Sequence, residues 1–182
     1  VLGRLRREQG KDAYQAGEYQ FTPGLVPDAL LNKLTAGDVV HYAFTMIEGW
    51  TVAQMRKALA EMPRLEHLTI DWSAEQLVEA LEIPQTTTLE DNLLLDSEQL
   101  EGWFFPASYD YHLGHSDLDI LRRAHQAMRD TLEQIWAERE EDLPYADTYE
   151  LLTMASIVEK ETGLAAERPE VAGVFVRRLK KG

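Results

Sequence analysis

Residues 151–163 read Leu-Leu-Thr-Met-Ala-Ser-Ile-Val-Glu-Lys-Glu-Thr-Gly, a mostly apolar run that ends in charged residues and a glycine. Asp147 followed by Glu150 is typical of a capping box, so we expect a helix from about Thr148 to Thr162. Gly163 is a natural stop just after it. Apolar side chains cover most of the circumference of this helix, which is typical of a helix buried in a protein core.

One acidic residue, Glu159, lies on this apolar surface between Leu152 and Ala155. A carboxyl group among apolar neighbours loses hydration, which disfavours its charged form and raises its pKa. A raised pKa suits a general acid near neutral pH. On the pattern alone, the alternative interpretation is a partly exposed glutamate at the end of a core helix.

Two further stretches accompany this helix. Residues 100–109 read Leu-Glu-Gly-Trp-Phe-Phe-Pro-Ala-Ser-Tyr, and residues 167–175 read Glu-Arg-Pro-Glu-Val-Ala-Gly-Val-Phe. Together with residues 155–162, they resemble three ordered motifs of the MltG/YceG-like endolytic murein transglycosylases. The resemblance covers most of residues 15–182, and it favours the functional interpretation of Glu159.

The resemblance implies an endolytic peptidoglycan lytic transglycosylase with Glu159 as its catalytic residue and with no cofactor. In this reaction class, one acid protonates the oxygen between N-acetylmuramic acid and N-acetylglucosamine. It then acts as the base while the muramyl C6 hydroxyl attacks the anomeric carbon, which gives a 1,6-anhydro end without consuming water. A lone glutamate fits this reaction better than hydrolysis, which usually needs two carboxylates.

Glu161 is a second carboxylate close to Glu159 in sequence, but two residues correspond to about 200° around a helix. The two side chains therefore point to opposite sides of the helix and cannot flank one glycosidic bond. We expect Glu161 to have a structural role, as a salt-bridge partner of Arg168 or Arg177.

The motif at residues 100–109 supplies the candidate substrate-binding residues Glu101 and Tyr109. The resemblance places Glu101 near the cleft, and a turn-capping role is the alternative. Tyr109 and Trp103 either stack on sugar rings or belong to the core. The chain has Ala107 and Ser108 where the family usually has aspartate and threonine. A role that the family gives to this aspartate is therefore in doubt here.

Composition excludes several classes of function. The chain has 182 residues, a formal net charge of −14 at pH 7 and no cysteine. An acidic surface argues against binding nucleic acid or anionic lipid through bulk charge, and thiolate metal sites are impossible. His112 and His115 stand near Asp117 without a His-Glu-x-x-His motif, so we expect no metal site there.

No apolar run approaches the roughly 18 residues of a membrane span, and no signal peptide is visible. Members of the resembled family carry one N-terminal membrane helix ahead of a periplasmic body, so we expect a soluble fragment of a bacterial inner-membrane protein. The implied partners are peptidoglycan glycan strands and penicillin-binding peptidoglycan synthases. Family members continue past the equivalent of Gly182, so we expect an incomplete cleft and less activity than in a longer chain.

The element pattern predicts an α+β fold with two parts. A small LysM-like βαβα module is expected over residues 1–64, and a mostly helical catalytic domain, incomplete at its C-terminus, over residues 65–182. The module has a basic helix-like start at residues 1–15 and strands at 18–21 and 39–47. The expected helices cover residues 27–34, 51–60, 73–81, 116–139, 148–162 and 169–181.

The main alternative function is a non-catalytic peptidoglycan-binding or scaffolding module. LysM modules elsewhere bind N-acetylglucosamine polymers, and Trp50 either stacks on sugar or is buried. A hydrolase that leaves reducing muramic ends is a second alternative. A Ser156–Lys160 nucleophile pair is disfavoured, because the known acyl-enzyme pattern has a spacing of three. We reject pyridoxal phosphate lyase chemistry, because no glycine-rich phosphate loop accompanies Lys160.

Overall fold

The computed structural model describes residues 17–84 and 100–181. Its helices and small antiparallel sheet confirm the predicted α+β class. The expected helix-like start at residues 1–15 lies outside the described residues.

The chain forms two compact units that do not follow the sequence in simple order. The first unit consists of residues 1–101 and 106–124, and the second of residues 102–105 and 125–182. The predicted boundary near Arg64 falls inside the first unit, and the assignment of a LysM-like module before it stays a prediction.

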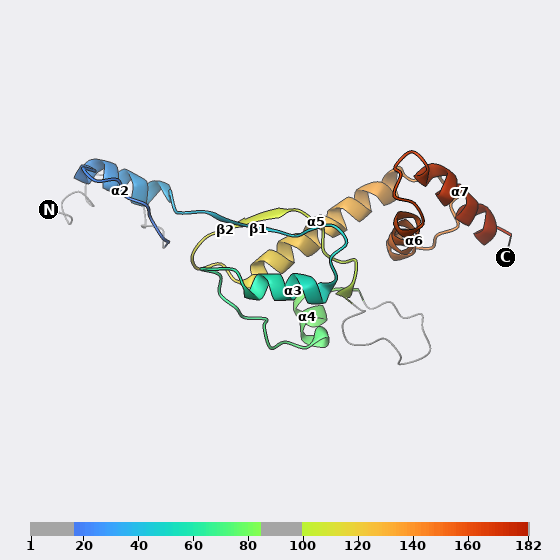
Figure 1. Cartoon of the computed structure of the whole chain (residues 1–182), viewed down its shortest axis with the longest axis horizontal. Helices are drawn as coiled ribbons and strands as arrows, with labels where there is room; N and C mark the ends of the chain where they lie inside the picture. Colours follow the sequence, from blue (N-terminus) through green and yellow to red (C-terminus); the bar gives the residue numbers. More distant parts are fainter. Residues whose placement is uncertain (1–16, 85–99, 182) are drawn as a thin grey trace. The chain divides into compact units, whose positions relative to one another are not determined.

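The helices and strands can be followed along the colours of Figure 1. In chain order they are α2 (Pro27–Ala36), β1 (Tyr42–Thr45), α3 (Val52–Ala60), α4 (Ala74–Leu81), β2 (Ser108–Tyr111), α5 (Asp117–Glu138), α6 (Thr148–Glu161) and α7 (Arg168–Leu179). Each helix predicted within the described residues is therefore confirmed, with ends that differ by a few residues.

The sheet pairs two strands that are far apart in sequence. β1 and β2 run antiparallel, with Phe44 opposite Tyr109 and Thr45 opposite Ser108. Phe44 and Tyr109 are buried, whereas the hydroxyls of Thr45 and Ser108 lie 2.8 Å apart on the exposed face. The alternation of buried and exposed residues in β2 is the pattern of a half-buried strand.

The strand predictions were partly wrong. Residues 18–21 do not form a strand. Glu18 is linked to the sheet region by the Val40 N–H, which donates to its carbonyl at 2.7 Å, and by the Tyr42 hydroxyl, which donates to its carboxylate at 2.8 Å. The strand expected at residues 39–47 is shortened to β1, and β2 was not predicted. The expected βαβα module therefore has one strand, β1, among its described residues, and β1 pairs with β2 from outside the module.

The predicted starts of α3 and α4 at Thr51 and Ser73 are confirmed, and each of them carries a capping box. The Thr51 hydroxyl accepts from the Gln54 N–H, and the Gln54 side chain accepts from the Thr51 N–H at 2.8 Å. Ser73 and Gln76 repeat this reciprocal pair at α4. Two otherwise unpaired N–H groups are satisfied at each helix start, which explains why both helices begin where the sequence indicates.

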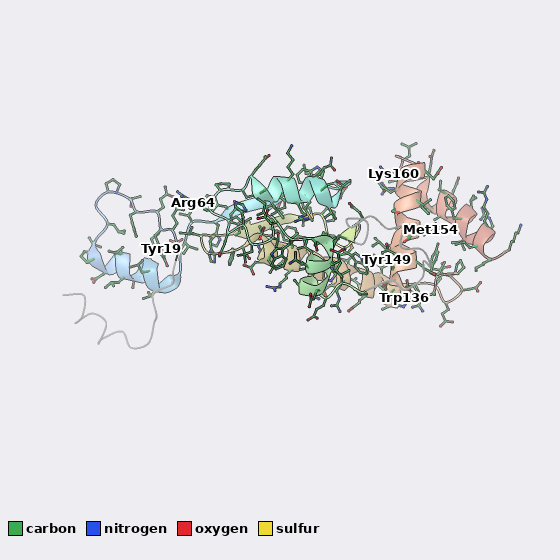
Figure 2. All side chains as sticks on the ribbon, turned by 90° about the horizontal axis from the view of Figure 1, so that it is seen from below. Tyr19, Arg64, Trp136, Tyr149, Met154 and Lys160 are labelled. Carbon is green, nitrogen blue, oxygen red and sulfur yellow. The ribbon has the colours of Figure 1, made fainter. Side chains whose placement is uncertain are left out.

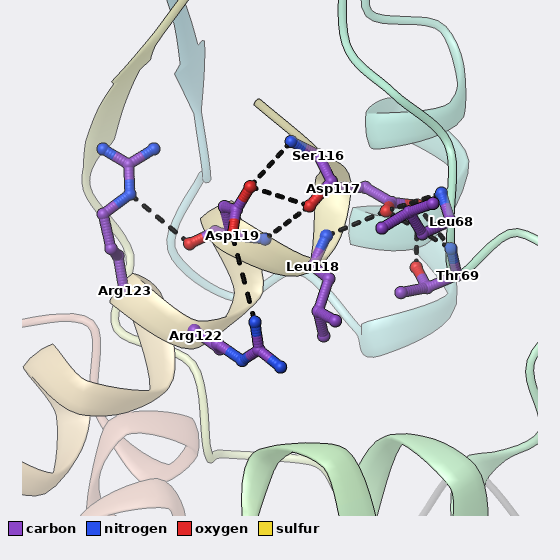
Figure 3. A network of polar contacts seen from close by, with 8 residues as sticks. All are labelled: Leu68, Thr69, Ser116, Asp117, Leu118, Asp119, Arg122 and Arg123. Atoms are coloured by element: carbon purple, nitrogen blue, oxygen red, sulfur yellow. Dashed lines mark hydrogen bonds and ion pairs between the residues drawn. The ribbon is translucent and has the colours of Figure 1, made fainter. Parts of the chain in front are cut away.

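A buried carboxylate, Asp117, ties the start of α5 to the segment before α4 (Figure 3). Its oxygens accept from the backbone N–H groups of Leu68, Thr69 and Leu118, and from the Thr69 hydroxyl at 2.8 Å. Asp117 is 3 % exposed, so its charge depends on these donors in place of water.

A buried histidine belongs to the core of the second unit. His125 is 4 % exposed, and its Nδ1 lies 3.1 Å from the Trp103 carbonyl oxygen. Its Nε2 has no hydrogen-bond partner within the described residues. Trp103 also stacks on Tyr149 of α6 with ring centroids 5.5 Å apart. Trp103 of the 100–109 motif thus packs against α6.

Acid is expected to destabilise the protein through His125. Burial lowers the pKa of His125 from the model-compound value of 6.5. The unfolded chain therefore binds this proton at higher pH than the folded chain, and stability falls as the pH drops through about 6.5 by at most about 1.4 kcal/mol per pH unit. His125→Gln should flatten this dependence between about pH 7.5 and 5.5 in chemical denaturation. The exposed control His67→Gln should leave it unchanged, and equal slopes for wild type and His125→Gln would contradict the assignment.

Candidate active site

A groove of about 490 Å³ lies between α6 and α7 in the second unit. Its charged members are Glu159 and Arg168. The rest of the lining is apolar apart from the hydroxyl of Tyr145, and it consists of Leu143, Tyr145, Leu151, Met154, Ala155, Val158, Pro169, Ala172 and Val176. Figure 2 shows Tyr149, Met154 and Lys160 at successive positions along α6. An apolar concavity with few polar groups is the usual form of a ligand site.

The N-terminus of α6 is fixed by Asp147, as the sequence predicts. Its carboxylate accepts from the backbone N–H groups of Tyr149 and Glu150, both at 2.9 Å. Glu150 does not close a reciprocal box with Asp147, because its carboxylate accepts from the Ala146 N–H at 2.7 Å. Both acidic side chains lie where the helix dipole favours negative charge.

The C-terminal end of α6 is formed by Thr162, and the predicted stop at Gly163 was wrong. Thr162 has an extended conformation with φ of −143°, and Gly163 does not have the positive φ of a glycine cap. The buried Thr162 hydroxyl donates to the Glu167 carboxylate at 2.8 Å and accepts from the Leu164 N–H at 3.1 Å. These bonds fix the turn from which α7 starts.

The expectation that α6 is buried on nearly all sides was wrong. Val158 is its one buried residue, and Ile157 is 37 % exposed. The Glu159 side chain is 61 % exposed, so the desolvation expected for its carboxyl group is absent. The apolar surface of α6 therefore forms the wall of an accessible groove, and the sequence pattern did not distinguish this wall from a core face.

Glu159 is paired with Arg168, the first residue of α7. Its two carboxylate oxygens lie 2.9 and 2.7 Å from the same guanidinium nitrogen, Nη2. Arg168 was expected, as an alternative to Arg177, to pair with Glu161, and it pairs with Glu159 instead. A six-residue turn separates Glu161 from Arg168, so the contact depends on tertiary geometry that helical spacing does not reveal.

The candidate residues Glu101 and Tyr109 belong to the first unit, whereas Glu159 belongs to the second. The Glu101 carboxylate accepts from the Val52 N–H at 3.0 Å, which favours the capping alternative. Tyr109 is 7 % exposed and Arg123 lies over its ring, with 5.9 Å between guanidinium carbon and ring centroid. Burial raises the pKa of Tyr109, against an opposing effect of Arg123. Its geometry is that of a core residue.

The remaining residues of interest have structural contacts. The Ala107 carbonyl, at the position where the resembled family usually has aspartate, accepts from the Met46 N–H at 2.9 Å and extends the sheet. The rings of His112 and His115 lie with centroids 3.7 Å apart. Within residues 17–84 and 100–181, no group of three or more acidic or histidine side chains is arranged to hold a metal. No helix in these ranges has both the length and the apolar character needed to cross a bilayer.

Gly102 allows the 100–109 motif to approach α6. Its φ is +82°, and a Cβ atom built on it would lie 3.1 Å from the Leu152 Cδ2 atom. Gly102→Ala is expected to lower the free energy of unfolding by about 1–2 kcal/mol, because a side chain in this conformation is strained. Thermal and urea denaturation measure the change.

Gly163→Ala is the matched control for Gly102→Ala. A Cβ atom at Gly163 would meet no atom within 4 Å, so stability should change by no more than about 0.5 kcal/mol. Equal losses in the two variants would show that the Gly102 conformation is not required.

Comparisons with known proteins agree with the motifs. The chain is 31 % identical over 180 residues to a Bacillus subtilis (strain 168) protein named endolytic murein transglycosylase, which covers 95 % of this chain and 49 % of the relative. It is 27 % identical over 192 residues to a protein of the same name from Streptococcus pneumoniae serotype 2 (strain D39 / NCTC 7466), covering 92 % and 33 %. The chain thus spans about half or less of the curated relatives it matches.

A solved structure and a family model complete the comparison. The crystal structure of a yceG-like protein from Listeria monocytogenes superposes with a TM-score of 0.51 at 21 % identity, covering 92 % of this chain and 57 % of that one. This likeness concerns the fold. A sequence model of the YceG-like family matches residues 1–182. The chain therefore belongs to the YceG-like family.

Proposed function

We propose that the protein is an endolytic lytic transglycosylase that cleaves the bond between N-acetylmuramic acid and N-acetylglucosamine in nascent peptidoglycan strands. The observation that carries the proposal is the position of Glu159, an accessible carboxylate on the wall of an apolar groove, within the motif on which the resemblance rests. The names of the Bacillus and Streptococcus relatives support the same reaction.

In the proposed mechanism, Glu159 acts first as acid and then as base. The protonated carboxyl group gives its proton to the bridging oxygen as the bond from the muramyl anomeric carbon to this oxygen breaks. The resulting carboxylate then removes the proton of the muramyl C6 hydroxyl while the hydroxyl oxygen bonds to the anomeric carbon. The catalyst is thereby restored in its protonated form, and the product carries a 1,6-anhydro ring.

The composition of the groove favours transglycosylation over hydrolysis. Glycosidases that hydrolyse place a second carboxyl group about 5–9.5 Å from the first. Among the described residues that line the groove, Glu159 is the one carboxylate. An internal nucleophile supplied by the substrate removes the need for a second one.

The proposal includes location and partners, which follow from the family resemblance. The activity is placed at the periplasmic face of a bacterial inner membrane, beside penicillin-binding peptidoglycan synthases. Residues 1–64 are proposed to be a LysM-like module. Membrane fractionation, cross-linking to the synthases and titration with N-acetylglucosamine oligomers test these three points in turn.

The proposed reaction has a diagnostic product. Purified protein incubated with isolated sacculi should release muropeptides with 1,6-anhydromuramic ends, which are 18 Da lighter than hydrolysed ends and are identified by mass spectrometry. Reducing muramic ends would show a hydrolase. Binding to sacculi without any new ends would favour the scaffolding alternative.

A further inference from the structure

A general acid must be protonated before it reacts, whereas the ion pair between Glu159 and Arg168 uses the ionised carboxylate. A guanidinium in contact with a carboxylate favours the ionised form of the acid. Both oxygens of Glu159 contact Arg168, so in the free protein the carboxylate is engaged with a counter-ion. The proposed reaction therefore needs an event that removes the counter-ion.

Arg168 has the donors and the freedom to bind a second anion. A guanidinium carries five N–H donors, and Glu159 engages the nitrogen Nη2. The Nε of Arg168 is buried and has no hydrogen-bond partner among the described residues. The side chain as a whole is 43 % exposed, and its partner Glu159 is 61 % exposed, so the pair is open to exchange on its solvent side.

If Arg168 turned away, no other positive charge in the described lining of the groove would face Glu159. Besides these two residues, the titratable member of the described lining is Tyr145, which precedes α6. Burial raises the pKa of Tyr145, so this phenol stays neutral. Lys160 and Glu161 are adjacent on α6 but do not line the groove. A bound strand that covers the groove would exclude water from Glu159 as well, and apolar surroundings without water or a counter-ion favour the protonated form of a carboxyl group.

Resting on the proposed function, we propose that Arg168 is a positioning residue that acts as an exchangeable counter-ion for Glu159. In the free protein, it holds the Glu159 carboxylate. When a glycan strand binds, the guanidinium turns to a carboxylate of the muramyl lactyl group or of its stem peptide. Glu159 then takes up one proton from solvent, and this proton is the one transferred to the bridging oxygen.

The first test follows the titration of Glu159 directly. Carboxyl-labelled [¹³Cδ]glutamate gives a carbon signal for each glutamate, and Glu159→Gln identifies the signal of interest. In Arg168→Gln, the titration midpoint should move up by about half a pH unit, since exposed ion pairs are weak. Lys160→Gln removes one positive charge outside the groove lining and should move it less. An unchanged midpoint in Arg168→Gln, or an equal shift in both variants, overturns the proposal.

The second test adds ligands that lack the scissile bond. The disaccharide N-acetylglucosaminyl-N-acetylmuramic acid carries a free lactyl carboxylate, its stem-peptide form carries peptide carboxylates, and chitobiose is neutral. At least one anionic ligand should raise the pH of the Glu159 titration midpoint in the wild-type protein. The same ligand should leave this midpoint unchanged in Arg168→Gln. Comparing the two anionic ligands shows whether Arg168 binds the lactyl carboxylate or a carboxylate of the stem peptide. A midpoint that no ligand moves, or that chitobiose moves equally, overturns the exchange.

These readouts do not depend on turnover. If sacculi yield no anhydro ends, the proposed function fails while the titrations still report on the ion pair. If anhydro ends appear but the Glu159 titration midpoint is the same in wild type and in Arg168→Gln, the proposed function stands and the counter-ion exchange is wrong. Arg168→Lys keeps the charge and should retain part of the ligand response, whereas a merely structural role of Arg168 predicts none.

Discussion

Replacing Glu159 by glutamine is expected to lower the release of 1,6-anhydro muropeptides by about 10²- to 10⁴-fold, the usual loss when a general acid is removed. The amide is nearly isosteric with the carboxyl group but cannot deliver a proton. The fold should remain intact, because the Glu159 side chain is 61 % exposed and its ion pair with Arg168 is at the surface. Product release from sacculi and the thermal transition are measured on the same preparation.

Glu161→Gln is the matched control for Glu159→Gln. Glu161 is exposed, two residues further along α6 and outside the groove lining. It should retain most of the activity and the stability. A Glu161 variant that is inactive but stable, together with an active Glu159 variant, would show that the wrong carboxylate was chosen.

The largest effect on stability is expected from Asp117→Ala. Removing this carboxylate leaves the backbone N–H groups of Thr69 and Leu118 and the Thr69 hydroxyl without their acceptor in a buried place. Each unsatisfied buried donor costs about 1–3 kcal/mol, so the free energy of unfolding should fall by roughly 3–5 kcal/mol. Urea denaturation measures this loss.

The next acidic residue, Asp119, provides the control. It accepts from the backbone N–H and hydroxyl of Ser116 at the same helix start, but its side chain is 44 % exposed. Because water replaces the lost acceptor, Asp119→Ala should cost about 1 kcal/mol. A loss in Asp117→Ala as small as this would mean that water reaches the buried donors as well.

The starts of helices were predictable because their signals are local. Thr51 with Gln54 and Ser73 with Gln76 each satisfy two N–H groups within four residues, so the sequence window contains the whole interaction. The same holds for Asp147 at the start of α6. Family membership also followed from local motifs, since the three stretches are contiguous in sequence.

The features that sequence reasoning missed depend on pairing across the chain. Strand β2 is four residues long and two of these are polar, and it becomes a strand because β1 lies beside it. Residues 18–21 have the alternation of a strand but no ladder partner in the described chain. The apolar periodicity of α6 identified residues that avoid water, but it could not reveal that they line a groove. The contact of Arg168 with Glu159 was hidden for the same reason.

The interleaving of the two units sets an order of events during synthesis on the ribosome. Every residue of the first unit precedes residue 125, so this unit can fold before α6 and α7 have been made. Trp103 and Phe104 leave the ribosome early but pack in the second unit, beside His125 and later residues. At a translation rate of about 5–20 residues per second, several seconds pass between the synthesis of Trp103 and that of its partner Tyr149 in α6. The nascent chain therefore exposes aromatic side chains after the first unit is complete, and a chaperone that binds such side chains can contact them until α6 has been made.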